Sequence, residues 1–552
     1  MHPTADTLLL KSNNGARRRV MLGVGRLLIS FGRYFCHKNT MQGVSLKEQV
    51  NLLWRILPTV KVFFFFKILL ALILSTSLSI PAQSTSDSAE RIQRIENGLL
   101  LPVSVKGQPS VSMKIVDRMQ FYKTPAVSIA FTNNGRIEWA RAYGVREAGS
   151  RETITTETIF QAGSISKPVA ATVALRMAQS GRFSLDEDVN KKLVSWKVPE
   201  NEFTREQKVT VRRILSHSAG LTNHAAGNYT SGAQLPTLLQ ILDGVKPANT
   251  PPIRVDSIPG SRWRYSGGGY GVLQQLLIDT GGKSFQTLAQ EIVFEPLEMK
   301  HSTFEQSLPD KFRRTAAVGH NRAGEKIAGN WITFPEMAAA GLWSTPSDLA
   351  RFAIELQKSK AGKSNKILTT ATTNQMLTRQ IENWGLGLVL EGESSSARFS
   401  HRGDTEGYKC LMVMYQNTGQ GAVIMTNSDR GDRLADEILR SIAKEYGWND
   451  YQPKEKVIAQ VNPKIHEAYF GQYELEISPD FVVTISAKNG NLVMTLKQPT
   501  GESSAELLPE SELRFFRREV DFEITFEIND SGKATGLVIR QDGSVYRAKK
   551  IK

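Results

Sequence analysis

The chain has 552 residues, more than one ordinary domain holds, and its 40% hydrophobic and 22% charged residues are typical of globular rather than fibrous or disordered proteins. Its net charge of +15 is uneven, because residues 1–82 hold eleven Lys and Arg against Asp6 and Glu48, and the remaining 470 residues carry only +6. Since no basic block stands out in that remainder, we expect no nucleic-acid partner.

The first 82 residues predict a basic leader that ends in a secretory signal. Lys61 and Lys67 flank four phenylalanines, an apolar run covers residues 68–74, and small residues lead to Ala82. This pattern over about 60–82 is typical of a signal cleaved after Ala82, and it predicts a periplasmic or secreted protein. The alternative is an uncleaved N-terminal anchor, although the run is short for a bilayer, and membrane contact is expected only there. Cleavage would leave a single cysteine, Cys410, and therefore no intramolecular disulfide.

After a polar linker over residues 83–104, the chain predicts a β-hairpin followed by a helix. Residues 126–131 alternate as a strand, residues 133–135 signal a tight turn, and residues 137–140 return as the partner strand. The apolar run over 169–178, closed by a glycine, is typical of a helix.

Ser164 and Lys167 stand at the beginning of this helix, and one helical turn brings their side chains together. A serine hydroxyl becomes a good nucleophile only when a neighbouring base takes its proton, and a lysine serves as that base when burial favours its neutral amine. The same spacing occurs at Ser441 and Lys444, which we interpret as part of an ordinary amphipathic helix.

Residues 184–330 carry helical patterns broken by proline and glycine, and strand patterns return after them. The later segments are predicted strands at 385–390, 411–415 and 422–425 and a helix over 434–446. Strands from both ends of the region, with helices between them, predict one sheet built from distant segments and an inserted helical subdomain.

Two further motifs carry chemistry. Tyr265 precedes a glycine-rich turn, and as a tyrosinate it could act as a general base if a cation such as Lys167 lowered its pKa. His401 could bind a substrate carboxylate or assist proton transfer, and the backbone N–H groups of Gly403 and Asp404 could face an oxyanion.

Together, Ser-x-x-Lys at 164, Tyr-Ser-Gly at 265 and His-x-Gly at 401 resemble the serine β-lactamase and penicillin-binding-protein superfamily. The likeness is to its class C β-lactamase-related branch, which includes D-Ala-D-Ala carboxypeptidases, D-aminopeptidases and family VIII esterases. The blocks at 214–221, 296–299 and 340–349 are similar to further motifs of that branch. The resemblance implies an α/β (α+β) fold over residues 105–450, with an antiparallel sheet flanked by helices and an all-helical subdomain.

The resemblance also implies roles for these residues. Ser164 would be the acylated nucleophile, Lys167 would activate it, and Tyr265 would be the base that passes the proton to the leaving group. The backbone N–H groups of Ser164 and Asp404 would form the oxyanion hole, with His401 and Gly403 beside it on the substrate-binding side.

Two departures from the family pattern bear on the substrate. The Asn of the family's Tyr-x-Asn is Gly267 here, so this substrate-binding position lacks an amide, and His401-Arg402-Gly403 replaces Lys-Thr-Gly. Both changes disfavour efficient β-lactam hydrolysis, and His-x-Gly is more typical of the peptidase and esterase members. No cofactor is implied, and the eight histidines form no ligand-spaced pair for a metal.

Residues 462–552 predict a separate, small all-β domain. Short strand patterns alternate with turn signals such as Asn489-Gly490, as in a small antiparallel barrel, and the segment is similar to the lipocalin-like tails of such hydrolases.

The sequence leaves two functions open for the protein. The first is a secreted serine hydrolase that acts on a D-amino-acid peptide, possible cell-wall fragments included, on a β-lactam or on a small ester. The alternative is a catalytically weak homologue that binds penicillin or cell-wall peptides.

Overall fold

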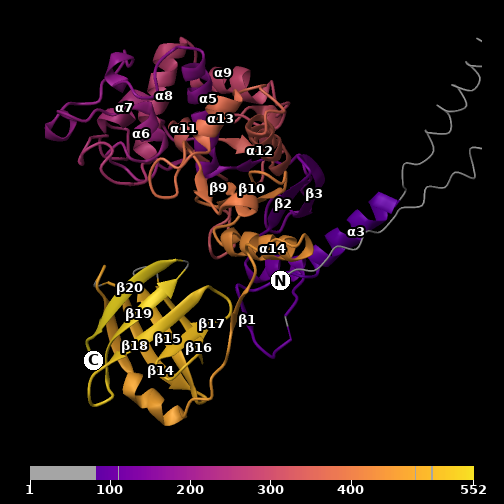
Figure 1. The fold of residues 1–552 in the computed structure, drawn as a ribbon, viewed down its shortest axis with the longest axis vertical. Coiled ribbons are helices and arrows are strands. Elements are labelled where there is room, and N and C mark those ends of the chain that lie inside the picture. Colours follow the sequence, from indigo (N-terminus) through magenta and orange to yellow (C-terminus); the bar gives the residue numbers. More distant parts are fainter. Residues whose placement is uncertain (1–82, 110, 479, 499–500, 542) are drawn as a thin grey trace, which may run out of the picture. The chain divides into compact units, whose positions relative to one another are not determined.

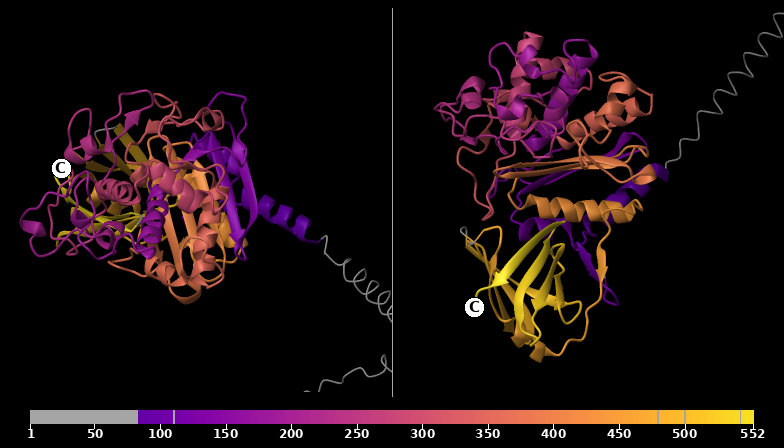
Figure 2. Two further views of the ribbon diagram at one scale, coloured as in Figure 1. Left: turned by 90° about the horizontal axis from the view of Figure 1, so that it is seen from above. Right: turned by 60° about the vertical axis from the view of Figure 1, so that its left-hand side comes forward.

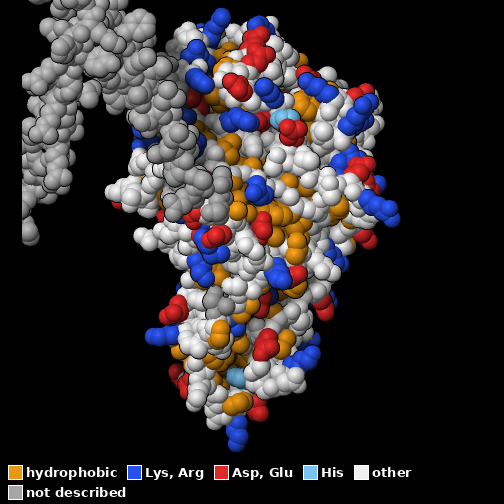
Figure 3. Space-filling model, turned by 90° about the vertical axis from the view of Figure 1, so that its right-hand side faces the viewer, with side chains coloured by type: hydrophobic (Ala, Val, Ile, Leu, Met, Phe, Trp, Pro, Cys, Tyr) orange, Lys and Arg blue, Asp and Glu red, His pale blue; other side chains and the backbone are white. Residues whose placement is uncertain are grey.

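The computed structural model describes residues 83–552 except residues 110, 479, 499–500 and 542, so the predicted leader lies outside the described residues. The chain divides into two units, Met1–Thr85 and Ser86–Lys552, and the features below belong to the second unless stated otherwise. None of the described helices combines the length and the apolar character that crossing a bilayer requires. On the face drawn in Figure 3, basic and acidic side chains are interspersed.

A six-stranded antiparallel sheet lies at the centre of the first folded region, with the strand order β3-β2-β11-β10-β9-β8 (Figure 1). Asn134 and Gly135 form the predicted hairpin turn between the first two strands, and both take the positive φ angles that such a turn needs. Strands from both ends of the region thus share one sheet, which confirms the predicted fold class. The strands are β2 (Ala126–Asn133), β3 (Arg136–Gly144), β8 (Val389–Glu391), β9 (Arg398–Thr405), β10 (Tyr408–Tyr415) and β11 (Gly421–Thr426).

Strand β2 is buried on both faces of the sheet because its side chains alternate between two apolar cores. Val127, Ile129 and Phe131 pack with helix α14 (Gly431–Glu445), which covers one face of the sheet. Ala126 and Ala130 join the larger core, which lies beneath the helical region on the opposite face. Figure 2 shows α14 against one side of the sheet and the helices that lie between β3 and β8 in the sequence gathered on the far side.

The predicted helical subdomain lies between β3 and β8 in the sequence. Its helices are η1 (Gly163–Ile165), α5 (Ser166–Gln179), η2 (Val189–Lys191), η3 (Glu202–Thr204), α6 (Val211–Leu215), α7 (Leu238–Asp243), α8 (Gly267–Gly281), α9 (Phe285–Ala289), η4 (Gln290–Phe294), α10 (Asp310–Arg313), α11 (Met337–Ala340), α12 (Pro346–Lys360) and α13 (Thr370–Met376). Two small ladders join its loops, β4 (Phe160–Gln161) with β7 (Trp343–Ser344) and β5 (Tyr229–Thr230) with β6 (Ile332–Thr333).

Two sequence expectations differ from the structure. Residues 84–89, expected in a polar linker, belong to helix α3 (Gln83–Glu96), and Ile92 and Ile95 at its end enter the core beneath α14. The strand expected over 385–390 is extended only from Val389. Gly387 before it has a φ of 88° and donates its N–H to the Leu215 carbonyl at 2.9 Å, so this stretch packs against helices instead of pairing.

The C-terminal region is a closed, antiparallel, eight-stranded barrel, as the strand pattern predicted. Its strands are β13 (Gly471–Leu475), β14 (Val482–Lys488), β15 (Asn491–Gln498), β16 (Gly501–Pro509), β17 (Arg514–Arg517), β18 (Phe522–Ile528), β19 (Ala534–Gln541) and β20 (Ser544–Lys550). Alternate side chains such as Phe515, Ile524 and Leu537 fill its interior.

A short parallel ladder joins the segments before and after the sheet region. Strand β1 (Val103–Val105) pairs with β12 (Lys454–Lys456), and Val103 and Val105 pack on Phe516 at the outer surface of the barrel. The remaining elements are α4 (Ile115–Phe121), η5 (Ser394–Ser396) and η6 (Pro463–Tyr469).

Candidate active site

Ser164 lies in the short turn η1, which leads directly into helix α5. Gly163 takes a φ of 52°, and a Cβ atom there would come within 2.8 Å of the backbone nitrogen of Asp404. The Ser166 hydroxyl donates to the Gly163 carbonyl at 2.6 Å and accepts the N–H of Leu342 at 2.9 Å. The chain therefore needs glycine at 163, and Ser166 holds the turn that presents Ser164 to the cavity.

Lys167 lies one turn along from Ser164, with its side chain almost completely buried at 2% exposure. Its Nζ atom lies 3.0 Å from Ser164 Oγ and donates to the Ala339 carbonyl at 2.8 Å. Burial lowers the pKa of Lys167 to about 7, because the apolar surroundings disfavour the ammonium form. A substantial fraction of neutral amine is thus available near neutral pH to accept a proton from Ser164.

Tyr265 lies just before helix α8 and faces the same pair. Lys167 Nζ is 4.8 Å from the centre of its ring, and the ring stacks on His217 with the centres 4.2 Å apart. Ser266, which caps α8 through the Gly269 N–H, donates its own N–H to His217 Nδ1 at 3.1 Å, so the cap also fixes the stacked ring.

The expectation that Lys167 makes Tyr265 a tyrosinate is disfavoured. Burial raises the pKa of Tyr265 well above its ordinary value, and this effect outweighs the lowering by its hydrogen bond with Ser164. Nearby Asp404 raises that pKa further. Tyr265 is therefore a neutral phenol near pH 7, which can donate and accept a proton but cannot act as a strong base.

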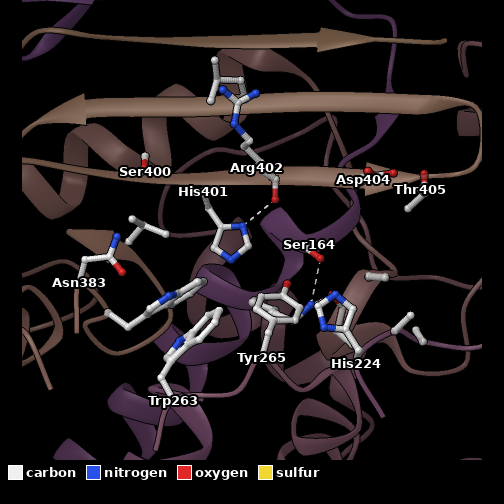
Figure 4. A pocket seen from close by; sticks show the side chains of 18 of the residues that line it. Ser164, His224, Trp263, Tyr265, Asn383, Ser400, His401, Arg402, Asp404 and Thr405 are labelled. Atoms are coloured by element: carbon white, nitrogen blue, oxygen red, sulfur yellow. Dashed lines mark hydrogen bonds between the residues drawn. The ribbon is translucent and has the colours of Figure 1, made fainter. Parts of the chain in front are cut away.

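His401 points from β9 into the cavity and is 4% exposed (Figure 4). Its Nδ1 lies 2.6 Å from the backbone carbonyl oxygen of Arg402. Burial first, and then the charge of Lys167, lowers the pKa of His401 to about 3, so the ring is neutral. A cationic His401 that binds a carboxylate, one of the two roles expected from the sequence, is therefore disfavoured.

The edge of β9 that bears Asp404 comes close to Ser164. Strand β8 pairs only with Arg398, Phe399 and Ser400, so no strand pairs with the rest of this edge. A side chain at 403 would overlap the carbonyl oxygen of Ala162, so Gly403 permits the close approach of β9 to the turn before α5. The backbone nitrogen of Asp404 consequently lies beside the turn that carries Ser164.

Two of the candidate residues, Gly403 and Gly267, lie outside the cavity lining. Gly267 belongs to helix α8. It is buried in the first turn of α8, where its N–H donates to the His224 carbonyl at 3.0 Å. A Cβ atom at 267 would lie 3.0 Å from that oxygen and 3.2 Å from the Ala225 carbonyl carbon. The loop at 224–225 thus lies directly against the position of the family's asparagine, and contact of Gly267 with substrate is not supported.

The cavity has a volume of about 1210 Å³ and brings together Ser164, Lys167, Tyr265, His401 and Asp404 (Figure 4). The lining also contains residues that the sequence motifs do not predict, among them His224, Trp263, Asn383 and Trp384. Trp263 stacks on Trp384 at 5.8 Å between ring centres, and the edge of Trp384 meets His401 at 5.7 Å.

One of these residues had a partial signal in the sequence. Trp263 stands two positions before Tyr265, within the same motif. Trp384 has no such signal. The sequence predicts a strand directly after it, and this prediction hides the turn that brings the Trp384 indole to His401. Among the residues that the structure describes, no group of three or more His, Cys, Asp and Glu side chains is arranged to hold a metal ion.

Comparison with protein families gives two matches. The Beta-lactamase family matches residues 112–446, more than half of the chain, and this match covers the sheet, the helical subdomain and every candidate residue predicted from the sequence. The chain belongs to the Beta-lactamase family. Residues 455–550, which contain the barrel, match a family described as a domain of unknown function (DUF3471).

Individual relatives of this Beta-lactamase family member include two penicillin-binding proteins. Penicillin-binding protein 4* of Bacillus subtilis (strain 168) is 22% identical over 446 residues, which are 77% of this chain and 95% of the relative. Penicillin-binding protein 4 of Amycolatopsis lactamdurans is 23% identical over 344 residues, 59% of this chain and 86% of the relative.

Solved structures share the fold. The octameric penicillin-binding protein homologue from Pyrococcus abyssi aligns with a TM-score of 0.54 and 21% identity, over 79% of this chain and 98% of its own. The D-amino acid amidase from Ochrobactrum anthropi SV3, complexed with L-phenylalanine amide, aligns with a TM-score of 0.51 and 20% identity, over 65% and 99%. The superfamily to which the chain belongs is one of serine hydrolases.

Proposed function

We propose that the protein hydrolyses an amide or ester bond by forming an acyl-enzyme on Ser164. The observation that carries this proposal is the 3.0 Å contact between Ser164 Oγ and Lys167 Nζ, in a site where burial lowers the pKa of Lys167 to about 7. A nucleophile paired with a base that is partly neutral at working pH is the arrangement that covalent acyl transfer needs.

Acylation begins when Ser164 Oγ attacks the substrate carbonyl carbon and its proton passes to the neutral amine of Lys167. The backbone N–H groups of Ser164 and Asp404 donate to the oxyanion that forms. The bond to the leaving nitrogen or oxygen then breaks, and the leaving atom receives the proton of Lys167 through the neutral phenol of Tyr265. The products are an ester on Ser164 and the protonated leaving group.

Deacylation uses the same groups in the reverse order. Water attacks the ester carbonyl while the phenol of Tyr265 passes the proton of that water to Lys167. The bond between Ser164 Oγ and the carbonyl carbon breaks, and Oγ takes a proton back from Lys167. Lysine is the base in both half-reactions because burial raises the pKa of Tyr265 and lowers that of Lys167.

The substrate candidates are a D-amino-acid peptide or amide, a β-lactam and a small ester. Similarity to penicillin-binding proteins and to the fold of a D-amino acid amidase supports this range. A second candidate function is a catalytically weak protein that binds penicillin or cell-wall peptides. The observation that favours it is Gly267, which offers no amide and lies beneath the loop at 224–225.

The test is time-resolved intact mass of the purified protein mixed with benzylpenicillin or with phenyl acetate. Wild-type protein should gain one acyl group, and Ser164→Ala should gain none. Ser441→Ala is the matched control, because this serine has the same Ser-x-x-Lys spacing but donates to the Ile95 carbonyl at 3.0 Å away from the cavity. A transient adduct with turnover supports the hydrolase, and a persistent penicillin adduct supports the binding protein. Acylation of Ser164→Ala would refute the nucleophile assignment.

We further propose that the protein is exported through the signal over about 60–82 and works in the periplasm or outside the cell. The basic, apolar and small-residue succession in that segment supports export. N-terminal sequencing of protein recovered from outside the cytoplasm should find a start at or near residue 83, and an intact leader would contradict cleavage.

A further inference from the structure

The hydrogen bonding of His401 determines what the cavity offers to a substrate. A carbonyl oxygen only accepts hydrogen bonds, so the 2.6 Å contact with the Arg402 carbonyl requires the hydrogen on Nδ1 of His401. In a neutral imidazole the other nitrogen, Nε2, then carries a lone pair and accepts. Nε2 is buried and has no hydrogen-bond partner among the described residues. At the position where related β-lactamases have a lysine, this cavity therefore presents an acceptor.

The charges around the cavity point in the same direction. Of the described residues in the lining, four are carboxylates, and the cations are Lys167 and Arg402. The guanidinium of Arg402 extends to the opposite face of the sheet from His401 and pairs with Asp436 at 2.6 Å (Figure 4). Lys167 is committed to Ser164. Both basic side chains of the lining are thus already paired with other groups of the protein.

Of the four carboxylates in the lining, only two are paired with a basic side chain of the described residues. Glu391 pairs with Arg398 at 3.3 Å and Asp404 pairs with Lys409, but Glu382 and Glu406 are exposed and form no ion pair or hydrogen bond with the described residues. Two uncompensated carboxylates at a partly enclosed site attract cations and repel anions more strongly than they would on an open surface.

We propose that the cavity selects substrates that carry a hydrogen-bond donor, above all a protonated amine, on the group that lies next to His401, and that it rejects a carboxylate there. This inference rests on the proposed hydrolase activity and narrows its substrate class. A carboxylate would bring its lone pairs against that of Nε2 and its negative charge into a cavity whose lining contains the unpaired Glu382 and Glu406. An ammonium group donates to Nε2, and its charge is opposite to that of these two glutamates.

Three aryl acetates test the proposal, since they share the scissile ester and differ only at the far side of the ring. They are 4-(aminomethyl)phenyl, 4-carbamoylphenyl and 4-carboxyphenyl acetate. Each kcat/KM is divided by the rate of hydroxide-catalysed hydrolysis of the same ester, which removes differences between the leaving groups. The carboxylate ester should react at least about 10-fold more slowly than the carbamoyl ester, and the ammonium ester should react faster than the carbamoyl ester.

Substitutions test which residues cause this selectivity. Gln at 401 can rotate its amide and offer a donor, so His401→Gln should reduce the ratio of the normalised kcat/KM values of the carbamoyl and carboxylate esters by about 3-fold or more. The double variant Glu382→Gln with Glu406→Gln should lose most of the preference for the ammonium ester. Its matched control, Glu206→Gln with Glu502→Gln, removes two exposed carboxylates outside the cavity and should keep that preference.

The outcomes separate the two proposals. If the carbamoyl ester neither reacts nor acylates Ser164, the hydrolase proposal fails and this inference fails with it. If the carbamoyl ester reacts but the carboxylate ester reacts equally fast, only the selectivity inference is overturned. If selectivity is present in the wild-type protein but unchanged in both the His401 and the glutamate variants, the assignment to these residues is wrong.

Discussion

At the scale of single residues, the environment of Lys167 is the feature on which the chemistry depends. Lysine is ordinarily protonated at neutral pH, and here it is buried against Ser164 and the Ala339 carbonyl, with no carboxylate partner among the described residues. Burial therefore acts unopposed on its pKa, whereas a buried ion pair would have kept the amine charged. The same burial raises the pKa of Tyr265. The lysine, and not the tyrosine, is therefore the group that is partly deprotonated near pH 7.

The first prediction at this scale concerns pH. Lys167 works as a base only when it is neutral, so activity should be full above its pKa and should fall as the pH drops through that value. Since burial lowers the pKa of Lys167 to about 7, kcat/KM for a neutral ester should show an acid limb with a midpoint near pH 7. A profile without a limb between pH 5 and about 9 would contradict the assignment.

Lys167→Arg tests the same base by substitution. Arginine keeps the positive charge but stays protonated, so it cannot accept the Ser164 proton. We expect kcat/KM to fall by about 100-fold or more, with the acid limb lost from the residual rate. A fold change below about 3, measured with protein whose circular dichroism is unchanged, would show that the charge of Lys167 matters and its basicity does not.

At the scale of elements, the site depends on the close approach of strand β9 to the turn η1. Gly163 and Gly403 face each other across this approach, where added side chains would meet the Asp404 nitrogen and the Ala162 oxygen. In the proposed mechanism the helix supplies the nucleophile, and the sheet edge supplies an N–H group for the oxyanion. Neither element forms the site alone, and the two glycines set the distance between them.

Gly403→Ala should therefore separate β9 from η1. We expect a loss of about 1–3 kcal/mol in the free energy of unfolding, from urea titration, because the new methyl group overlaps a backbone carbonyl. The acylation rate should fall as well, since the Asp404 N–H moves with the strand. Gly271→Ala is the matched control, because its Cβ would meet only Leu242 at 3.5 Å and Leu238 at 4.0 Å inside helix α8. Equal effects of the two substitutions would contradict this account.

At the scale of the whole molecule, the barrel is held to the segments that flank the sheet region. Phe515 and Phe516 are neighbours on β17, so Phe515 points into the barrel and Phe516 points outward. Phe516 is nevertheless completely buried, because Val103 and Val105 of the β1–β12 ladder cover it. An outward aromatic side chain with no exposure indicates a built contact and not a solvent-facing barrel wall.

Phe516→Ala tests whether this contact couples the two regions. We expect a loss of about 3 kcal/mol in stability and, in calorimetry, separation of one unfolding transition into two. Val545→Ala is the control, since this barrel side chain is 58% exposed and should cost no more than about 0.5 kcal/mol. A single unshifted transition in the Phe516 variant would mean that the contact carries little energy.

Most of the elements and the Ser164–Lys167 pair could be predicted from the sequence alone. The hairpin at 126–144, the helix that begins after Ser164 and the barrel strands follow from the spacing of apolar residues and from turn residues, which are local properties. The closeness of Ser164 and Lys167 has the same origin, because a helical turn brings residues three apart together.

The protonation states and the access to the site follow from the tertiary packing and could not be predicted from the sequence. The neutral ring of His401 depends on burial, and its tautomer depends on the carbonyl beside it in β9. The loop at 224–225 over Gly267 and the indole of Trp384 against His401 join residues that are far apart in the chain. Contacts of this kind set pKa values and access to the cavity, and no pattern of neighbouring residues encodes them, since they exist only once the sheet edge and the helices have packed.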